Sequence, residues 1–139
     1  MSDFQASGVA QGRQFAEQCD QLLHHLRFEL RGKRNLRQIG VEIDQVAVAP
    51  SGEEVWFEYK GSVQGDRPGL RRTDTLKKAI ANGALLKAWG EAARYVILTS
   101  HLPTEGAGFA MLELAKSAGF FHDVICIYDP SSQSRLRRL

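Results

Sequence analysis

Three side chains suited to metal-dependent hydrolysis fall close together in this sequence of 139 residues. Asp44 lies in the run VEIDQVAVA, and Glu58 and Lys60 lie in the run EEVWFEYKG. Both runs are rich in β-branched or aromatic residues and flank the turn-forming segment Pro50-Ser51-Gly52, so they predict the two strands of a β-hairpin. A three-residue loop would place Asp44 opposite Glu58 and Glu42 opposite Lys60.

Two opposed carboxylates repel each other and weaken a sheet, so such a pair needs a compensating charge. A hard divalent cation supplies it, because two carboxylates, a backbone carbonyl such as that of Tyr59 and several waters match the preferences of Mg²⁺. Lys60 shares the face of Glu58 and could position or deprotonate a metal-bound water, or stabilise negative charge on a phosphate. This combination suits phosphodiester hydrolysis. The alternative is a solvent-facing hairpin in which Glu42 and Lys60 form an ordinary cross-strand ion pair.

The elements that must hold these residues follow from hydrophobic periodicity and turn signals. We predict a helix over 11–30, a short strand near 35–38, strands over 41–49 and 53–61, a helix over 75–92, a strand over 94–100, a helix over 104–118 and a strand over 123–129. This order predicts one α/β domain with a central mixed sheet flanked by helices, ending in a right-handed parallel β-α-β unit. Residues 1–11 and 131–139 are expected to be flexible tails.

The apolar spacing also predicts which helical residues face the core. In the first helix these are Phe15, Cys19, Leu22, Leu26 and Leu30, with Gly32 ending the pattern. In the helix over 104–118 they are Ala107, Ala110, Met111, Leu114 and Ala118, with Thr104 as its cap and Gly119 as its stop.

The formal net charge of +2 hides a strong segregation of charge. Residues 27–38, 60–87 and the last residues from Arg135 carry fifteen basic and three acidic side chains, so the rest of the chain is acidic. A polyanion partner is a common reason for such segregation. Four basic residues lie at or just before a predicted helix start: Arg71, Arg72, Lys77 and Lys78. We predict that they contact a DNA backbone, with an exposed charged helix face as the alternative.

Several function classes are not expected. Cys19 and Cys126 lack the spacing of a zinc site or a disulfide framework. No apolar run is long enough to span a membrane, and the polar start lacks the plan of a signal peptide, so we expect a cytoplasmic protein without a membrane partner. No P-loop motif is present, so no nucleotide cofactor is predicted.

At the hairpin, GVEIDQVAVAPSGEEVWFEYKGS resembles the core of the PD-(D/E)XK, or restriction-endonuclease-like, nuclease superfamily. Asp44, Glu58 and Lys60 match its three motif positions, and the succession of elements over roughly 12–129 resembles its common core. The resemblance implies a Mg²⁺-dependent DNA endonuclease, with Mn²⁺ as a substitute metal. Related compact nucleases also suggest a homodimer. Restriction, repair, recombination and mobile-element processing all remain open as its role.

The chain departs from the family pattern at two places. Ile43 replaces the Pro before Asp44, a position that varies within the superfamily. Many members carry an acidic residue after a Phe on the first helix, but Ala16 follows Phe15 here and Glu17 comes one residue later. Gln64 is a further candidate, since some related nucleases use a Gln downstream of the motif. A non-catalytic nucleic-acid-binding or assembly module that retains the fold, and an RNA-processing nuclease, are the alternative functions.

Overall fold

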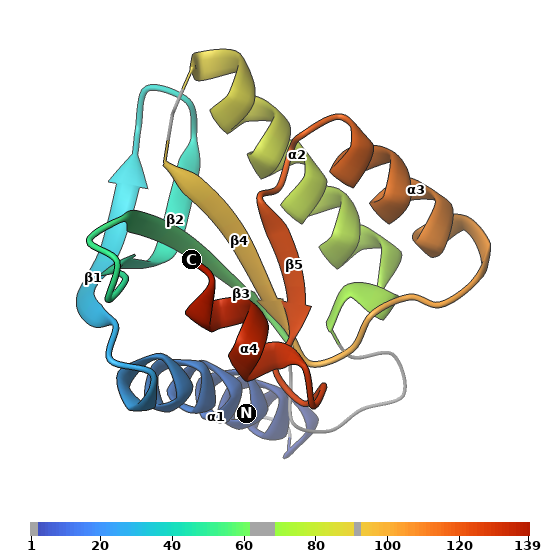
Figure 1. Cartoon of the computed structure of the whole chain (residues 1–139). Coiled ribbons are helices and arrows are strands. Elements are labelled where there is room, and N and C mark those ends of the chain that lie inside the picture. Colours follow the sequence, from blue (N-terminus) through green and yellow to red (C-terminus); the bar gives the residue numbers. More distant parts are fainter. Residues whose placement is uncertain (1–2, 62–68, 91–92) are drawn as a thin grey trace.

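The fold is a three-layer α/β arrangement in which helices cover both faces of one sheet (Figure 1). The computed structural model describes residues 3–61, 69–90 and 93–139, with side chains from Arg13 onward. Its elements are α1 (Asp3–His25), β1 (Glu29–Leu36), β2 (Val41–Val48), β3 (Glu54–Lys60), the 3-10 helix η1 (Gly69–Arg71), α2 (Thr73–Trp89), β4 (Arg94–Thr99), α3 (Gly106–Ser117), β5 (Asp123–Cys126) and α4 (Ser132–Arg137).

The five strands lie in the order β1-β2-β3-β4-β5. β1, β2 and β3 pair antiparallel, whereas β3, β4 and β5 pair parallel, so the predicted mixed sheet and the parallel β-α-β unit are confirmed. Strands β2, β3 and β4 follow the predicted boundaries to within one residue. Among the described residues, no helix combines the length and the apolar character needed to cross a membrane.

Two hydrophobic cores lie on opposite faces of the sheet. Ile97 of β4 packs with residues of α2 and α3, while Leu98, the next residue, packs with residues of α1 and α4. Successive side chains of a strand point to opposite faces, which is why one apolar strand serves both cores. Trp56 is only 3% exposed and packs in the core that includes residues of α2 and α3.

The first helix ends earlier than its apolar spacing predicts. Helix α1 stops at His25, and Arg27 adopts a left-handed conformation with φ 67°. The backbone N–H of Phe28 then donates to the carbonyl of Leu23, 3.0 Å away, and β1 begins at Glu29. Leu30 therefore belongs to a strand, and the strand predicted near 35–38 is the end of a longer one. An apolar residue at a helical spacing fits either element, so periodicity alone did not locate the boundary.

Helix α3 also differs from the prediction in its buried face. It begins at Gly106 with Glu105 as its N-cap, not Thr104. Leu112 and Ala115 are buried, whereas Leu114, predicted to face inward, is 72% exposed. The apolar residues of this helix are too evenly spread around its axis to single out one face.

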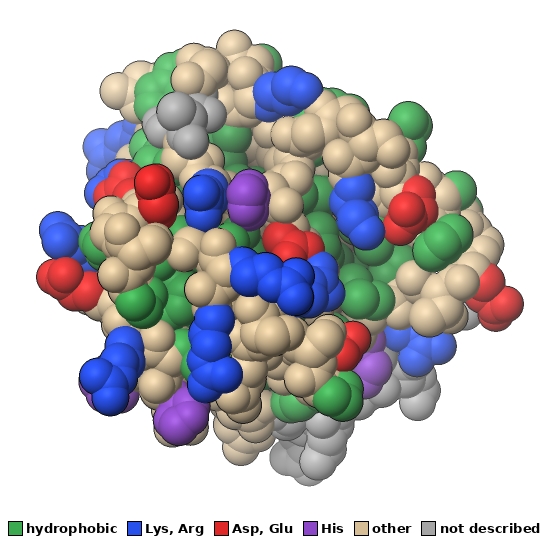
Figure 2. All heavy atoms as spheres, in the orientation of Figure 1, with side chains coloured by type: hydrophobic (Ala, Val, Ile, Leu, Met, Phe, Trp, Pro, Cys, Tyr) green, Lys and Arg blue, Asp and Glu red, His purple; other side chains and the backbone are tan. Residues whose placement is uncertain are grey.

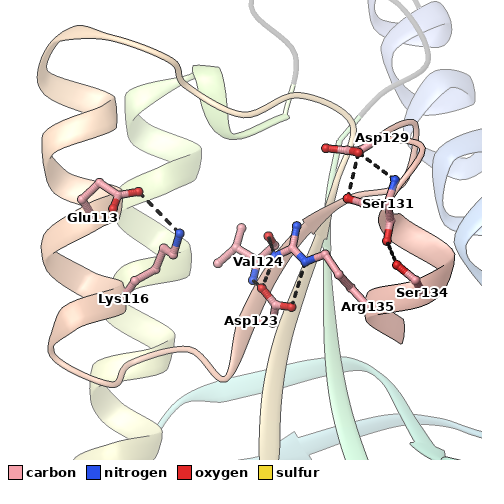
Figure 3. A network of polar contacts seen from close by, with 8 residues as sticks. All are labelled: Glu113, Lys116, Asp123, Val124, Asp129, Ser131, Ser134 and Arg135. Carbon is pink, nitrogen blue, oxygen red and sulfur yellow. Dashed lines mark hydrogen bonds and ion pairs between the residues drawn. The ribbon is translucent and has the colours of Figure 1, made fainter. Parts of the chain in front are cut away.

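The C-terminal residues form a docked helix, not the flexible tail that we predicted. Leu136 of α4 is fully buried and Leu139 is 5% exposed, both in the core beneath α1. Figure 3 shows Arg135 reaching Asp123 of β5: Nε donates to Oδ2 over 3.2 Å, and Nη2 donates to Oδ1 and, over 3.0 Å, to the carbonyl of Val124. At the N-terminal end, α1 begins at Asp3, so residues 3–11, which we predicted to be part of a flexible tail, are helical.

We expect Arg135→Gln to lower the free energy of unfolding by about 1–2 kcal/mol, because it removes a two-pronged, charge-assisted contact that is roughly three-quarters buried. Urea unfolding monitored by circular dichroism measures the change. Arg138→Gln is the matched control on an exposed side chain of the same segment. Equal stability of the two variants would show that α4 is held by Leu136 and its apolar neighbours alone.

Candidate active site

Glu58 and Lys60 lie next to each other near the end of β3. The Glu58 side chain is 5% exposed, and its Oε1 lies 3.3 Å from Nζ of Lys60, whose side chain is 21% exposed. The predicted common face of these two residues is therefore confirmed. The alternative ion pair between Glu42 and Lys60 is not formed, since Glu42 instead lies 3.6 Å from Lys33 on the neighbouring strand.

The β2–β3 hairpin has the predicted three-residue loop. The backbone N–H of Ala49 donates to the carbonyl of Glu53 over 2.8 Å, and Gly52 adopts a left-handed φ of 91°. Regular pairing continues to Gln45 and Phe57 and ends one position before Asp44 and Glu58. The register that we predicted is thus correct where the strands pair, but Asp44 and Glu58 are not partners in the ladder.

Asp44 lies at an irregularity of β2. The pairing of β1 with β2 shifts register between Val46 and Ile43, and both of these side chains enter the same core. The regular alternation of side chains is therefore broken between Ile43 and Val46, where Asp44 lies. Oδ2 of Asp44 accepts a hydrogen bond of 2.8 Å from the backbone N–H of Tyr59. Asp44 therefore lies beside the Glu58–Lys60 segment through a side-chain contact with the backbone of β3 and not through cross-strand pairing with Glu58.

The pKa of Glu58 reflects its burial and the nearby charge of Asp44. Burial, and then the negative charge of Asp44, raise the pKa of Glu58 to about 7, against an opposing effect of Lys60 and of the Tyr95 phenol. A pKa near 7 leaves Glu58 only partly ionised at neutral pH, chiefly because the side chain is buried and secondarily because Asp44 is close. A positive charge placed between them would favour the ionised form of both.

The donor set fits Mg²⁺ in kind. Within the described ranges, no group of three or more His, Cys, Asp and Glu residues could hold a metal ion. Mg²⁺ is commonly bound through only one or two carboxylates and retains several waters, so Asp44, Glu58 and the carbonyl of Tyr59 are a sufficient protein contribution. Nζ of Lys60 lies 3.3 Å from Oε1 of Glu58, so Lys60 would have to move away before a cation could bind that oxygen.

The acidic residue that faces the sheet from α1 is Asp20, which the sequence prediction missed. Its Oδ1 accepts hydrogen bonds from the phenol of Tyr59, 2.6 Å away, and from Nε2 of Gln45, 3.1 Å away. Glu17, the acidic residue that follows the Phe15-Ala16 pair, is exposed. The only signal in the sequence was that Asp20 lies three residues before Leu23, at the margin of the apolar stripe of α1.

A double-mutant cycle should detect this network. We expect Tyr59→Phe and Asp20→Ala to show a coupling of about 1–2 kcal/mol in the free energy of unfolding, because their hydrogen bond is short, ionic and partly buried. Burial and Asp20 raise the pKa of Tyr59, so its phenol remains the donor at neutral pH. Tyr128→Phe removes a half-exposed phenol and should cost less than about 0.5 kcal/mol. Additive effects of Tyr59→Phe and Asp20→Ala would exclude the coupling.

The four basic residues predicted to contact DNA lie on η1 and in the first turns of α2. Arg71 ends η1, Arg72 is the N-cap of α2, and Lys77 and Lys78 lie on α2; all four side chains are exposed. The backbone N–H of Leu70 donates to the carbonyl of His101, just beyond β4. This hydrogen bond places η1 at the end of β4. Lys60, the last residue of β3, pairs with Thr99, the last residue of β4, so η1 and the candidate site lie at the same end of the parallel strands.

The other basic segment, within β1, is largely compensated by acids. Ion pairs join Arg31 to Glu29, Lys33 to Glu42 and Arg34 to Glu54, at 3.3, 3.6 and 3.6 Å. On the face shown in Figure 2, Lys and Arg side chains are likewise interspersed with carboxylates and do not form one patch. The basic residues of β1 are therefore largely paired with acids, although the sequence groups them in a basic segment. Gln64 lies outside the described residues.

Comparison with known proteins adds no relative. No protein-family model, no curated protein and no solved structure matches this chain. Any assignment of function therefore rests on the residues and contacts described above.

Proposed function

We propose that this protein is a Mg²⁺-dependent DNA endonuclease with a restriction-endonuclease-like core. The observation that carries the proposal is the buried Glu58–Lys60 pair with Asp44 beside it, at the carboxyl end of the parallel strands. In open α/β sheets this end commonly carries the ligand site. The order of elements, with a helix before an antiparallel hairpin and a β-α-β unit after it, agrees with the core that the motif resembles.

In this proposal Asp44, Glu58 and the carbonyl of Tyr59 hold Mg²⁺, and Mn²⁺ can replace it. When bound, the metal supplies Lewis acidity toward a phosphate oxygen and toward water. Nζ of Lys60 leaves Oε1 of Glu58 and donates a hydrogen bond to the attacking water or to the phosphate oxygen on which negative charge develops. The resemblance implies products with 5′-phosphate and 3′-hydroxyl ends.

Arg71, Arg72, Lys77 and Lys78 position the DNA in this proposal. All four are exposed, and among the residues that the structure describes only Arg72 of these four forms an ion pair, with Asp74 at 3.9 Å, so we expect their charges to be available to phosphates. Contacts to phosphates fix the position of a duplex without reading its sequence. A homodimer would let two such sites act on two strands. Light scattering after size-exclusion chromatography tests this part, and a mass of 15.5 kDa at working concentration would exclude the dimer.

One observation favours a second candidate, a non-catalytic nucleic-acid-binding or assembly module that keeps the nuclease fold. Both oxygens of Glu58 already have protein donors, Lys60 on Oε1 and Tyr95 on Oε2. In a module without metal, this arrangement would simply stabilise a buried carboxylate.

A substrate panel separates the two candidates. Supercoiled plasmid, branched DNA, single-stranded DNA and RNA are incubated with Mg²⁺, with Mn²⁺ and with EDTA. We expect cleavage of at least one DNA substrate that EDTA abolishes. Binding without cleavage on every substrate would favour the module, and cleavage confined to RNA would favour an RNA-processing nuclease.

A further inference from the structure

Tyr95 reaches the candidate site from the strand next to Glu58. In the parallel pairing of β3 with β4, Tyr95 lies beside Trp56, and Glu58 lies beside Ile97. Tyr95 and Glu58 are thus diagonal neighbours, and the phenol of Tyr95 donates a hydrogen bond of 3.1 Å to Oε2 of Glu58. Tyr95 is 5% exposed and Glu58 is 4% exposed, so water does not compete freely for this contact.

The phenol is itself held in place. Burial and the charge of Glu58 raise the pKa of Tyr95, so the hydroxyl stays protonated and remains a donor. The side chain of Asn82 on α2 forms a hydrogen bond with the same hydroxyl. The ring also packs at 6.1 Å, centroid to centroid, from the ring of Phe121. These contacts come from α2, from the neighbouring strand β3 and from the segment before β5.

The two oxygens of Glu58 therefore differ in their partners. Oε2 is bound by a neutral hydroxyl on a buried, packed ring, whereas Oε1 lies 3.3 Å from a flexible ammonium that is 21% exposed. A cation that approaches Glu58 can displace Lys60, which has three rotatable donors and access to water. It cannot easily displace Tyr95, because the ring is 5% exposed and packs against Phe121, and moving it would break the hydrogen bond between its hydroxyl and Glu58.

We propose that Tyr95 is a positioning residue that commits Oε2 of Glu58 to the protein and leaves Oε1 as the oxygen for the divalent cation. Asn82 supports this role by holding the phenol. The inference rests on the proposed function and deepens it. It states which oxygen of Glu58 would bind the metal after Lys60 leaves, and which contact keeps the carboxylate from rotating. Partners behind a metal ligand commonly change metal affinity by tenfold to a hundredfold when removed.

The test is Mn²⁺ binding to the metal-free full chain, measured by isothermal titration calorimetry with wild type and Tyr95→Phe. Phe retains the ring and its packing, so we expect a folded variant whose dissociation constant for Mn²⁺ is at least about tenfold higher. Asn82→Ala should shift it in the same direction by a smaller factor. Tyr128→Phe is the matched control, because its phenol is half-exposed and bonded to Gln18, and its affinity should equal that of wild type.

A second readout excludes a merely structural role. In single-turnover DNA cleavage, a high Mg²⁺ concentration should return the rate of Tyr95→Phe to nearly that of wild type, because the variant retains Asp44, Glu58 and Lys60. Equal Mn²⁺ affinity of wild type and Tyr95→Phe would overturn this inference alone, as would a cleavage defect that Mg²⁺ does not rescue. Failure of wild type to bind Mn²⁺ would instead overturn the proposed function and, with it, the inference.

Discussion

Lys60→Met is expected to slow DNA cleavage by about 10²- to 10³-fold at saturating Mg²⁺, the cost of removing one preorganised donor that stabilises developing charge. The substitution keeps the length and apolar stem of the side chain, which lies mostly buried along β3. Only the ammonium, with its contact to Oε1 of Glu58, is lost. The measurement is single-turnover conversion of supercoiled to nicked plasmid.

Lys33→Met provides the matched control for this prediction. Lys33 is also a strand lysine paired with a glutamate, but its side chain is 73% exposed and its partner Glu42 lies in the solvent-facing part of β2. We expect its cleavage rate to stay within about threefold of wild type, since a surface ion pair contributes little. Comparable rates for Lys60→Met and wild type would remove Lys60 from the chemistry, whatever the other residues do.

The hairpin that carries the candidate site could be predicted because short-range signals determine it. Runs rich in β-branched or aromatic residues define both strands, and Pro50-Ser51-Gly52 sets the loop length, which in turn sets the register. The bulge at Asp44 and Gln45 could not be predicted in this way. Oε1 of Gln45 accepts a hydrogen bond of 2.6 Å from the backbone N–H of Gly32, thirteen residues earlier, so the irregularity depends on a partner strand whose position the hairpin does not encode.

Asp20, Tyr95 and helix α4 were not predicted for the same reason, because distant contacts determine their positions. Asp20 is placed by Tyr59, which lies 39 residues away in the sequence, and Tyr95 by Glu58, which lies 37 residues away. Neither has a local pattern that marks it as polar and inward-facing. Helix α4 is short and mostly polar, and only its docking of Leu136 and Arg135 against distant elements makes it part of the fold. Tertiary contacts decide such positions, and they override local propensity.

The metal-free protein is expected to lose about 3 kcal/mol of stability between pH 4.5 and pH 7 through Glu58 alone. In the folded chain burial and Asp44 raise the pKa of Glu58 to about 7, whereas its ordinary value is 4.5. Between these values the unfolded chain releases the proton and the folded chain retains it. Unfolding is therefore favoured increasingly as the pH rises, and the loss is complete once the pH passes the folded-state pKa. Chemical unfolding in EDTA across this range measures it.

Glu58→Gln should flatten this pH dependence, because an amide of the same shape has no proton to release, and the variant should be the more stable protein at pH 8 in EDTA. Glu42→Gln is the control, since the exposed Glu42 side chain should leave the dependence unchanged. Addition of Mg²⁺ at pH 8 should restore stability to wild type and not to Glu58→Gln, because a bound cation favours the ionised carboxylate. An unchanged pH dependence in Glu58→Gln would mean that Glu58 is ionised throughout this pH range in the folded protein.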